Sequence, residues 1–360
     1  MIYNEQTGQR FFGYRTATLL LLLLTISLQT STASEIPQGE YYGAIPSEKP
    51  DWFKESFLEF EDDVTEAATA GRRVMLYFHQ EGCPYCAKLV EENFTDPEIK
   101  AYIIKHFDGI SLNMWGDREV VSIGGQDFTE KTFAAALKVQ YTPTLVFLDE
   151  NGKVALRLNG YYPPADFRAA LDYVSQKLEQ KLSFSQYRFD KLASVDGNLI
   201  NEDFFLDNAD LGKLISSTNK PLAVYFESPN CAECKTMHER ILTDQATRKL
   251  VLKANNVQFN VASEQPLITP AGEQTSARQW AHDLGINYTP SLIFFDPQGN
   301  EVMRIGAFMK TFHFQSVYAY VLEKAYLEEP EFQRYISARA DHIREAGFDT
   351  DIWGYDSFHD

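Results

Sequence analysis

The fold is decided by residues 72–96, which read RRVMLYFHQEGCPYCAKLVEENFTD. The apolar run from Val74 to Phe78 is typical of a strand that is buried on both faces. The residues that follow, from about Cys83 to Asn93, favour a helix. Two cysteines separated by two residues therefore stand where a buried strand gives way to a helix.

A second stretch repeats this pattern 148 residues later. Residues 220–244 read KPLAVYFESPNCAECKTMHERILTD and match the first stretch at seven of 25 positions, both cysteines included. Further along, VQYTPTLVFLD at 139–149 matches INYTPSLIFFD at 286–296 at six of 11 positions. Two collinear matches at nearly one offset indicate two copies of one domain, because a repeat this long is a folded unit rather than one turn of a solenoid.

The repeat predicts how the chain is organised. In each copy, alternating helices and strands end in a hairpin and a helix, which favours an α/β fold with a mixed central sheet flanked by helices. The predicted segments are a signal peptide at 1–34, copy one at 51–182, a linker at 183–205, copy two at 206–327, and an acidic, aromatic tail at 328–360. The tail is expected to pack on its own domain, to fray, or to dock on a partner.

The amino-terminal segment predicts export. Arg10 and Arg15 precede a mostly apolar run, Leu19 to Leu28, and small residues follow as far as Ser34. This order is typical of a secretory signal peptide, and it predicts an exported protein. A bacterial periplasm and eukaryotic secretion both fit this segment. An uncleaved short anchor remains an alternative, although the run falls short of the roughly 20 residues that span a bilayer. No membrane span is expected after cleavage.

Composition narrows the classes of function. The chain of 360 residues carries 33 basic and 51 acidic residues, a formal net charge of −18. Such a surface repels a phosphate backbone, which argues against binding to nucleic acid. Four cysteines are too few for a disulfide scaffold. We expect these cysteines to carry the chemistry.

All four cysteines fall into two CxxC pairs, Cys83 with Cys86 and Cys231 with Cys234. At the start of a helix, unpaired backbone N–H groups and the helix dipole favour a thiolate over a thiol. The first cysteine of each pair is therefore expected to have a lowered pKa and to act as the nucleophile. The second lies one helical turn later and is expected to be the more buried, resolving thiol.

A Tyr-Thr-Pro sequence precedes a predicted strand in each copy, at Thr142-Pro143 and Thr289-Pro290. A cis bond would turn the threonine backbone toward the cysteine helix, where an extended substrate could pair with it. An ordinary trans proline at the start of a strand also fits the spacing.

A strand, a CxxC helix and a Thr-Pro before a terminal hairpin together resemble the thioredoxin superfamily, and copy one is similar to the periplasmic SoxW-type thioredoxin-like proteins. The resemblance implies redox-active cysteines, cis bonds at Pro143 and Pro290, and thiol–disulfide exchange with protein substrates. It also implies a membrane thiol reductant of the DsbD/CcdA type as electron donor. One departure precedes the first cysteine, where Gly82 and Asn230 stand in place of the tryptophan of thioredoxin.

A second departure concerns proton transfer. Tyr77 and Tyr225 replace the buried aspartate to which the family assigns a proton-accepting role. His79 and Glu227, four residues before the first cysteine of each pair, are candidate proton acceptors. A role as surface or strand-end residues fits them equally well.

Other readings of the cysteines remain. A permanent disulfide in so short a loop removes little chain entropy and is a poor staple. A four-cysteine zinc site would join pairs more than 100 residues apart, and haem attachment needs a histidine where Ala87 and Lys235 stand. We therefore expect no metal and no cofactor, and an enzyme of the thiol–disulfide oxidoreductase type. The alternative is a binding or chaperone module in which copy two is a docking domain.

Overall fold

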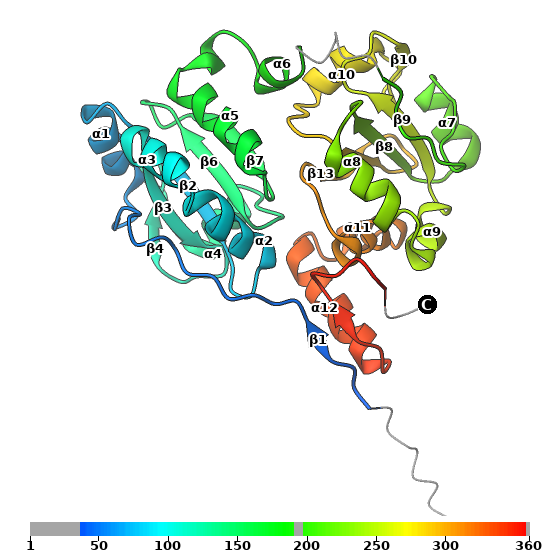
Figure 1. The fold of residues 1–360 in the computed structure, drawn as a ribbon, viewed down its shortest axis with the longest axis horizontal. Helices are drawn as coiled ribbons and strands as arrows, with labels where there is room; N and C mark the ends of the chain where they lie inside the picture. Colours follow the sequence, from blue (N-terminus) through cyan, green and yellow to red (C-terminus); the bar gives the residue numbers. More distant parts are fainter. Residues whose placement is uncertain (1–36, 191–196, 358–360) are drawn as a thin grey trace, which may run out of the picture. The chain divides into compact units, whose positions relative to one another are not determined.

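Each copy is built around a four-stranded mixed sheet with helices on both faces (Figure 1). The computed structural model describes residues 37–190 and 197–357. The predicted signal peptide, 1–34, lies outside the described residues, and so do residues 191–196 of the predicted linker.

The sheet of copy one has the order β3-β2-β6-β7. The central strand β2 runs parallel to β3 and antiparallel to β6, and β6 pairs antiparallel with β7. The strands of this copy are β2 (Arg73–His79), β3 (Phe107–Asn113), β6 (Thr144–Leu148), β7 (Val154–Asn159) and a small hairpin of β4 (Glu119–Val121) and β5 (Asp127–Thr129). The helices are α1 (Phe60–Thr69), α2 (Pro84–Lys88) continued by the π-helical turn η1 (Leu89–Phe94), α3 (Pro97–His106), α4 (Glu130–Ala136), α5 (Pro164–Ser175) and the short η2 (Leu178–Gln180).

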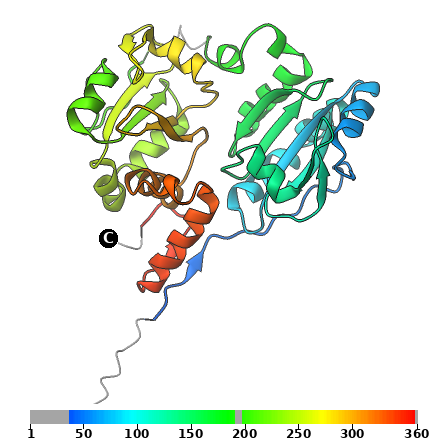
Figure 2. The ribbon, with the colours of Figure 1, turned by 180° about the vertical axis from the view of Figure 1, so that it is seen from behind.

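Copy two repeats this topology with the order β13-β12-β8-β9 (Figure 2). The strands are β8 (Leu222–Glu227), β9 (Asn255–Asn260), β12 (Ser291–Phe295), β13 (Glu301–Ile305) and the hairpin of β10 (Pro266–Ile268) and β11 (Gln274–Ser276). The helices are α7 (Leu211–Thr218), α8 (Ala232–Thr236) continued by η4 (Met237–Ile241), α9 (Gln245–Val251), α10 (Ala277–Asp283) and α11 (Thr311–Leu322). Two α/β units with mixed sheets confirm the predicted fold class.

The apolar run that predicted the central strand divides its side chains between two cores. Met75 and Tyr77 pack in the cluster formed with α2, η1, α3 and α5. Leu76 and Phe78 pack on the other face, with α1 and α4. Successive side chains of a strand point to opposite faces, so a strand covered on both sides must be apolar throughout. This packing fixes the end of β2, from which the chain enters the cysteine helix.

The predicted linker is partly helical. Helix α6 (Phe184–Phe189) begins at a capping box in which Ser183 and Gln186 bond each other's backbone N–H groups. Its first residue, Phe184, is buried in the core of copy one, and its last, Phe189, is buried in a core of copy two. The linker is therefore anchored to both copies by its aromatic ends.

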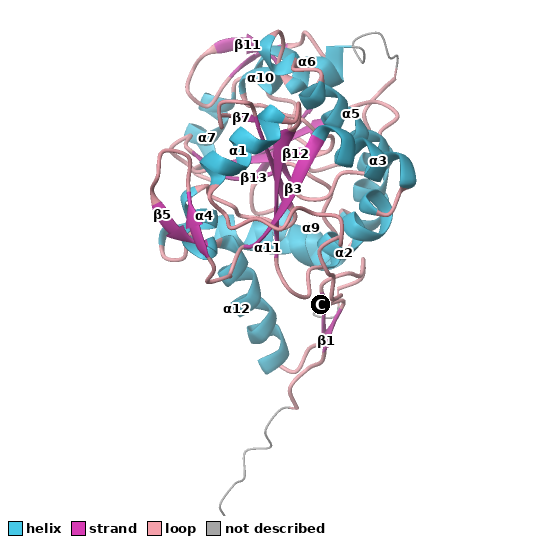
Figure 3. Ribbon diagram, turned by 90° about the vertical axis from the view of Figure 1, so that its left-hand side faces the viewer, coloured by secondary structure: helices cyan, strands magenta, loops and turns pink. Residues whose placement is uncertain are grey.

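The carboxyl-terminal tail folds back onto the chain. After the short η5 (Ala325–Leu327), it forms the 14-residue helix α12 (Phe332–Glu345) and the strand β14 (Thr350–Asp351), which pairs in parallel with β1 (Tyr41–Tyr42) (Figure 3). Phe332 and Ile336 of α12 are buried in a core of copy two. Of the three expectations for the tail, packing on its own chain matches these contacts.

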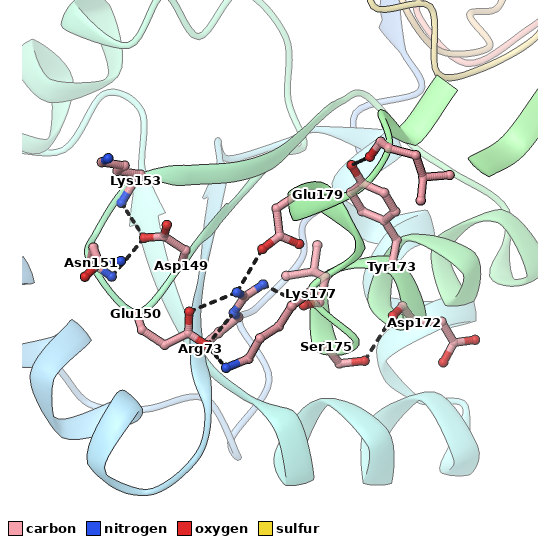
Figure 4. Close-up of polar contacts among 12 residues, drawn as sticks. Arg73, Asp149, Glu150, Asn151, Lys153, Asp172, Tyr173, Ser175, Lys177 and Glu179 are labelled. Atoms are coloured by element: carbon pink, nitrogen blue, oxygen red, sulfur yellow. Dashed lines mark hydrogen bonds and ion pairs between the residues drawn. The ribbon is translucent and has the colours of Figure 1, made fainter. Parts of the chain in front are cut away.

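A cluster of charged residues surrounds the buried Arg73 at the start of the central strand of copy one (Figure 4). The guanidinium of Arg73, whose side chain is only 4% exposed, donates to Glu150 at 2.9 and 3.1 Å and to Glu179 at 2.9 Å. It also donates to the carbonyl of Val174 at 2.6 Å. The hydrogen bond from Arg73 to Glu150 is the main cause that lowers the pKa of Glu150 to about 2, and a hydrogen bond from Lys177 adds to the effect. The cluster joins β2 to the end of α5.

Candidate active site

Cys83 caps the amino terminus of the helix that follows β2. Its Sγ accepts a hydrogen bond from the backbone N–H of Cys86 at 3.1 Å and from the hydroxyl of Thr142 at 3.3 Å. Burial acts to raise the pKa of Cys83, but the hydrogen bonds from the Cys86 and Thr142 side chains and from backbone N–H groups outweigh it. The pKa of Cys83 is therefore lowered, which is the property expected of a nucleophilic thiolate.

Cys86 has the opposite environment. Its side chain is fully buried, one helical turn after Cys83, and both thiols are free. Burial raises the pKa of Cys86 well above the ordinary value, and the neighbouring Cys83 sulfur raises it further. The two thiols of one pair are thus divided into an ionisable sulfur and a protonated one, in the order predicted from the helix geometry.

The Thr-Pro bonds adopt the state that the resemblance implies, because both Thr142–Pro143 and Thr289–Pro290 are cis. The carbonyl oxygen of Thr142 lies 3.4 Å from the sulfur of Cys83. The sequence predicted that the backbone of Thr142 would face the cysteine helix. The sequence did not single out the Thr142 hydroxyl, which also reaches the sulfur.

Copy two presents its cysteines in the same way, but as a disulfide between Cys231 and Cys234. Cys231 is the helix cap, and its sulfur accepts from the N–H of Cys234 at 3.0 Å and lies 3.4 Å from the carbonyl of Thr289. The Thr289 hydroxyl, however, pairs with Ser228 at 3.1 Å rather than with the sulfur. The cysteine geometry is repeated, and the threonine contact is not.

The residue before each leading cysteine has a left-handed backbone, with φ of +70° at Gly82 and +60° at Asn230. Glycine adopts this conformation without a steric penalty, and asparagine tolerates it better than most residues. The departure from tryptophan at this position is therefore accounted for by the turn that leads into the cysteine helix.

The residues at the position of the family's aspartate are neutral phenols. Tyr77 is buried, and its pKa is raised well above 10 by burial and by the nearby thiols of Cys86 and Cys83. His79 stacks on the ring of Tyr77, with 5.3 Å between the ring centroids. Burial is the main cause that lowers the pKa of His79, so this imidazole is neutral at pH 7 and can accept a proton.

Glu227, the counterpart of His79, belongs to a buried chain of ionisable groups. Its carboxylate lies 3.1 Å from Nε2 of His238, and Nδ1 of the same ring lies 2.9 Å from Glu202. Gln258 donates to Glu227 at 3.0 Å. Burial acts to lower the pKa of His238, but its hydrogen bonds and charge interactions with the two carboxylates prevail and raise it. Glu227 was predicted at this site, whereas Glu202 and His238 were not. The only sequence signal was His238 four residues after Cys234.

A cavity of about 420 Å³ opens beside Cys83. One wall comes from copy one, the second from residues 307–309 and 312–313 of copy two, and the third from α12. Sequence reasoning missed the last two walls, because nothing in the repeat indicates that one copy faces the other. The side chains from α12 that line the cavity are Gln333, Arg334, Ile336 and Ser337.

Among the described residues, no group of three or more His, Cys, Asp and Glu side chains is arranged to hold a metal ion. Within residues 37–190 and 197–357, every helix is too short or too polar to traverse a lipid bilayer.

The comparison with protein families identifies the class of the chain. A model described as a thioredoxin-like domain matches twice, at residues 60–175 and 211–322. The two matches cover more than half of the sequence, and the chain therefore belongs to the thioredoxin-like domain family. The search of curated proteins found no match.

Solved structures of thioredoxin folds are similar to parts of the chain. A thioredoxin-fold protein from Helicobacter pylori is 26% identical, with 34% of this chain and 80% of that chain covered and a TM-score of 0.30. A thioredoxin from Thermus thermophilus is 24% identical, with 39% and 89% covered and a TM-score of 0.28. The reduced DsbD carboxyl-terminal domain of Neisseria meningitidis is 14% identical, with 31% and 90% covered and a TM-score of 0.25.

Proposed function

We propose that this chain is a thiol–disulfide oxidoreductase with two CxxC sites. The observation that carries the proposal is the division of labour in copy one. The Cys83 sulfur accepts hydrogen bonds from a helix N–H and from the Thr142 hydroxyl, while Cys86 is sealed beneath it. Copy two repeats the capping contact at Cys231. Membership of the thioredoxin-like family supports the same chemistry.

The exchange reaction follows from these environments. The Cys83 thiolate attacks one sulfur of a substrate disulfide, and the other sulfur leaves as a thiol once protonated. Cys86 then loses its proton and attacks the Cys83 sulfur, which releases the second thiol and leaves a Cys83–Cys86 disulfide. His79 is the proposed proton acceptor in copy one, since its imidazole is neutral and stacks on Tyr77 near Cys86. Glu227 has this role in copy two, where its carboxylate is held by His238 and Gln258.

The site of action and the partners are also proposals. The sequence pattern of residues 10–34 supports export to the periplasm, where disulfides are stable. The family resemblance favours protein disulfides as substrates of the chain and a membrane thiol reductant of the DsbD/CcdA type as electron donor. Net direction is set by the reduction potentials of the two pairs against these partners.

Insulin reduction by the full chain tests the proposal. With dithiothreitol as reductant, the wild type is expected to accelerate precipitation of the insulin B chain. The double variant Cys83→Ser Cys231→Ser is expected to have no activity. A double variant as active as the wild type would refute the enzyme and favour the binding or chaperone module. Circular dichroism of each variant controls for folding.

A further inference from the structure

The loops that frame Cys83 are covered by the rest of the chain. Tyr85, inside the CxxC motif, accepts a hydrogen bond from the backbone N–H of Lys310 at 2.8 Å. Tyr141, beside the cis-proline, donates to the carbonyl of Arg304 at 2.7 Å. Each of these contacts joins copy one to copy two. A surface through which the Cys83 site would meet a folded protein is therefore already occupied.

The cover is a packed interface. Tyr141 is buried in a core cluster of copy two, and Tyr288 of copy two is buried in a core cluster of copy one. At Gly160 the backbones approach so closely that an added Cβ would lie 2.5 Å from the Cβ of Ala307. Helix α12 is fixed to copy one by hydrogen bonds of Gln333 with Gln80 and with the carbonyl of residue 140. A protein that docked on these loops would have to displace all of these contacts.

What remains beside Cys83 is the cavity of about 420 Å³, within the usual range for sites that hold a small molecule. Its lining is largely aromatic and apolar, with one acidic side chain, Glu81, and one basic side chain, Arg334. Both are exposed, and no ion pair involves either of them among the described residues. His313, the other titratable base in the lining, is half-buried, and desolvation of its ring lowers its pKa to about 4, so it adds no charge at neutral pH.

We infer that the Cys83 site takes a small zwitterionic disulfide, of the amino-acid or short-peptide type, through this cavity. The inference rests on the proposed function and narrows the substrate class of one of its two sites. Arg334 is placed to attract a substrate carboxylate and Glu81 a substrate ammonium. Protein disulfides are left to copy two, where Cys231 is partly exposed and Ala232 is exposed.

The Cys83–Cys86 dithiol supplies both electrons that a single turnover needs. Cys83 attacks one sulfur of the small disulfide, the S–S bond breaks, and the leaving thiolate takes a proton. Cys86 displaces the second thiol, so the substrate gains two electrons and is released as two thiols while the Cys83–Cys86 dithiol is oxidised to a disulfide. A dithiol reductant restores the pair for the next turnover.

The test uses the full chain with Cys231→Ser and Cys234→Ser, so that only the copy-one site reacts. The reduced protein is mixed with cystine or with insulin, and each rate is divided by the rate of the same disulfide with dithiothreitol. We expect the ratio for cystine to exceed that for insulin at least tenfold. Equal ratios would overturn the inference and leave the proposed function intact. No reaction with either disulfide would remove the proposed function of this site as well.

A matched pair of variants tests the route. Ser337 lines the cavity, whereas the adjacent Ala338 of α12 does not, and both are exposed. Ser337→Trp is expected to slow cystine reduction at least fivefold, and Ala338→Trp to leave it unchanged, with both unfolding midpoints at the wild-type value. Arg334→Gln is expected to slow the reduction of the anionic disulfide dithiodiglycolate several-fold and to leave the reduction of the cationic disulfide cystamine unchanged. Full activity of Ser337→Trp toward cystine would overturn the inference.

Discussion

The two copies share one topology, but the buried charged residue of the central strand stands at opposite ends of that strand. In copy one, Arg73 stands at the start of β2 and binds Glu150. In copy two, Glu227 stands at the end of β8 and binds His238. A strand of six or seven residues is about 20 Å long, so the first cluster lies far from its cysteines. The second adjoins them, because His238 follows Cys234 by one helical turn.

The threonines before the cis-prolines differ as well. The Thr142 hydroxyl donates to the sulfur of Cys83, while the Thr289 hydroxyl pairs with Ser228. Gln80 is the residue of copy one that corresponds to Ser228. Its side chain forms hydrogen bonds with Trp115 and Gln333 and not with the threonine. The two copies thus place their cysteines in the same geometry but surround them with different hydrogen-bond partners. We expect the polar contacts of copy one to act mainly on the reactivity of Cys83, and those of copy two mainly on the proton acceptor Glu227.

The largest expected effect is at the buried carboxylate of copy two. Glu227→Gln removes the charge that pairs with His238, and breaking a buried ion pair costs about 3 kcal/mol. We expect a loss of this order in the free energy of unfolding, measured with urea, and a slower resolution step at Cys234. His79→Gln, the matched change in copy one, is expected to cost under about 1 kcal/mol. Equal losses would remove the contrast between the two strand ends.

The second effect isolates stability from chemistry. Arg73→Met deletes hydrogen bonds to Glu150, Glu179 and Val174, and we expect it to cost about 2 kcal/mol of unfolding free energy. Because Arg73 lies at the far end of β2, the rate at which iodoacetamide alkylates Cys83 should stay at the wild-type value. A change in that rate would show that the cluster is coupled to the cysteines after all.

The third effect is confined to one sulfur. Thr142→Val keeps the side-chain shape and removes the O–H donor to Cys83, so the pKa of Cys83 should rise, because a hydrogen bond to the charged form stabilises the thiolate. The rate of a chromogenic disulfide with reduced protein at pH 7 should fall several-fold. Thr289→Val should leave Cys231 as reactive as before. A fall of the same size in both variants would contradict the threonine contrast.

The last effect is a difference in how the free energy of unfolding depends on pH. The pKa of Glu150 is lowered, so its stabilising contribution is present above its ordinary pKa of about 4.3 and is lost as the pH falls toward 2. The pKa of His238 is raised, so its contribution is present below about 6.5 and is lost as the pH rises through the higher folded value. The free energy of unfolding is measured with urea between pH 3 and 9. Its fall at acid pH should be smaller in Arg73→Met than in the wild type, and its fall at alkaline pH should be smaller in His238→Gln. A pH dependence equal to that of the wild type in both variants would refute the roles assigned to Glu150 and His238.

The sequence was sufficient for the fold class, because the apolar run Val74–Phe78 and the CxxC pairs occur twice at one offset. It was sufficient for the order of the thiols too, since spacing alone places Cys86 one turn beneath Cys83. The helix α6 escaped notice, because its two anchoring residues, Phe184 and Phe189, stand in a polar stretch that reads as a linker.

The rest of the site depends on contacts between segments far apart in the chain. The pairing of Glu227 with His238 and Glu202 joins a strand end, a helix and the segment before α7. The cavity beside Cys83 needs α12, more than 240 residues away. No periodicity or motif reports which face of a helix meets a distant loop, so these features appear only once the chain is folded.

The central claim is that Cys83 is a stabilised thiolate beside a protonated Cys86, and alkylation of the reduced full chain tests it most directly. Each cysteine is labelled with iodoacetamide from pH 4 to 10 and quantified by mass spectrometry. The account predicts a midpoint for Cys83 below the ordinary thiol value of about 8.5 and a midpoint for Cys86 above it. A Cys83 profile that coincides with that of a free model thiol would contradict it.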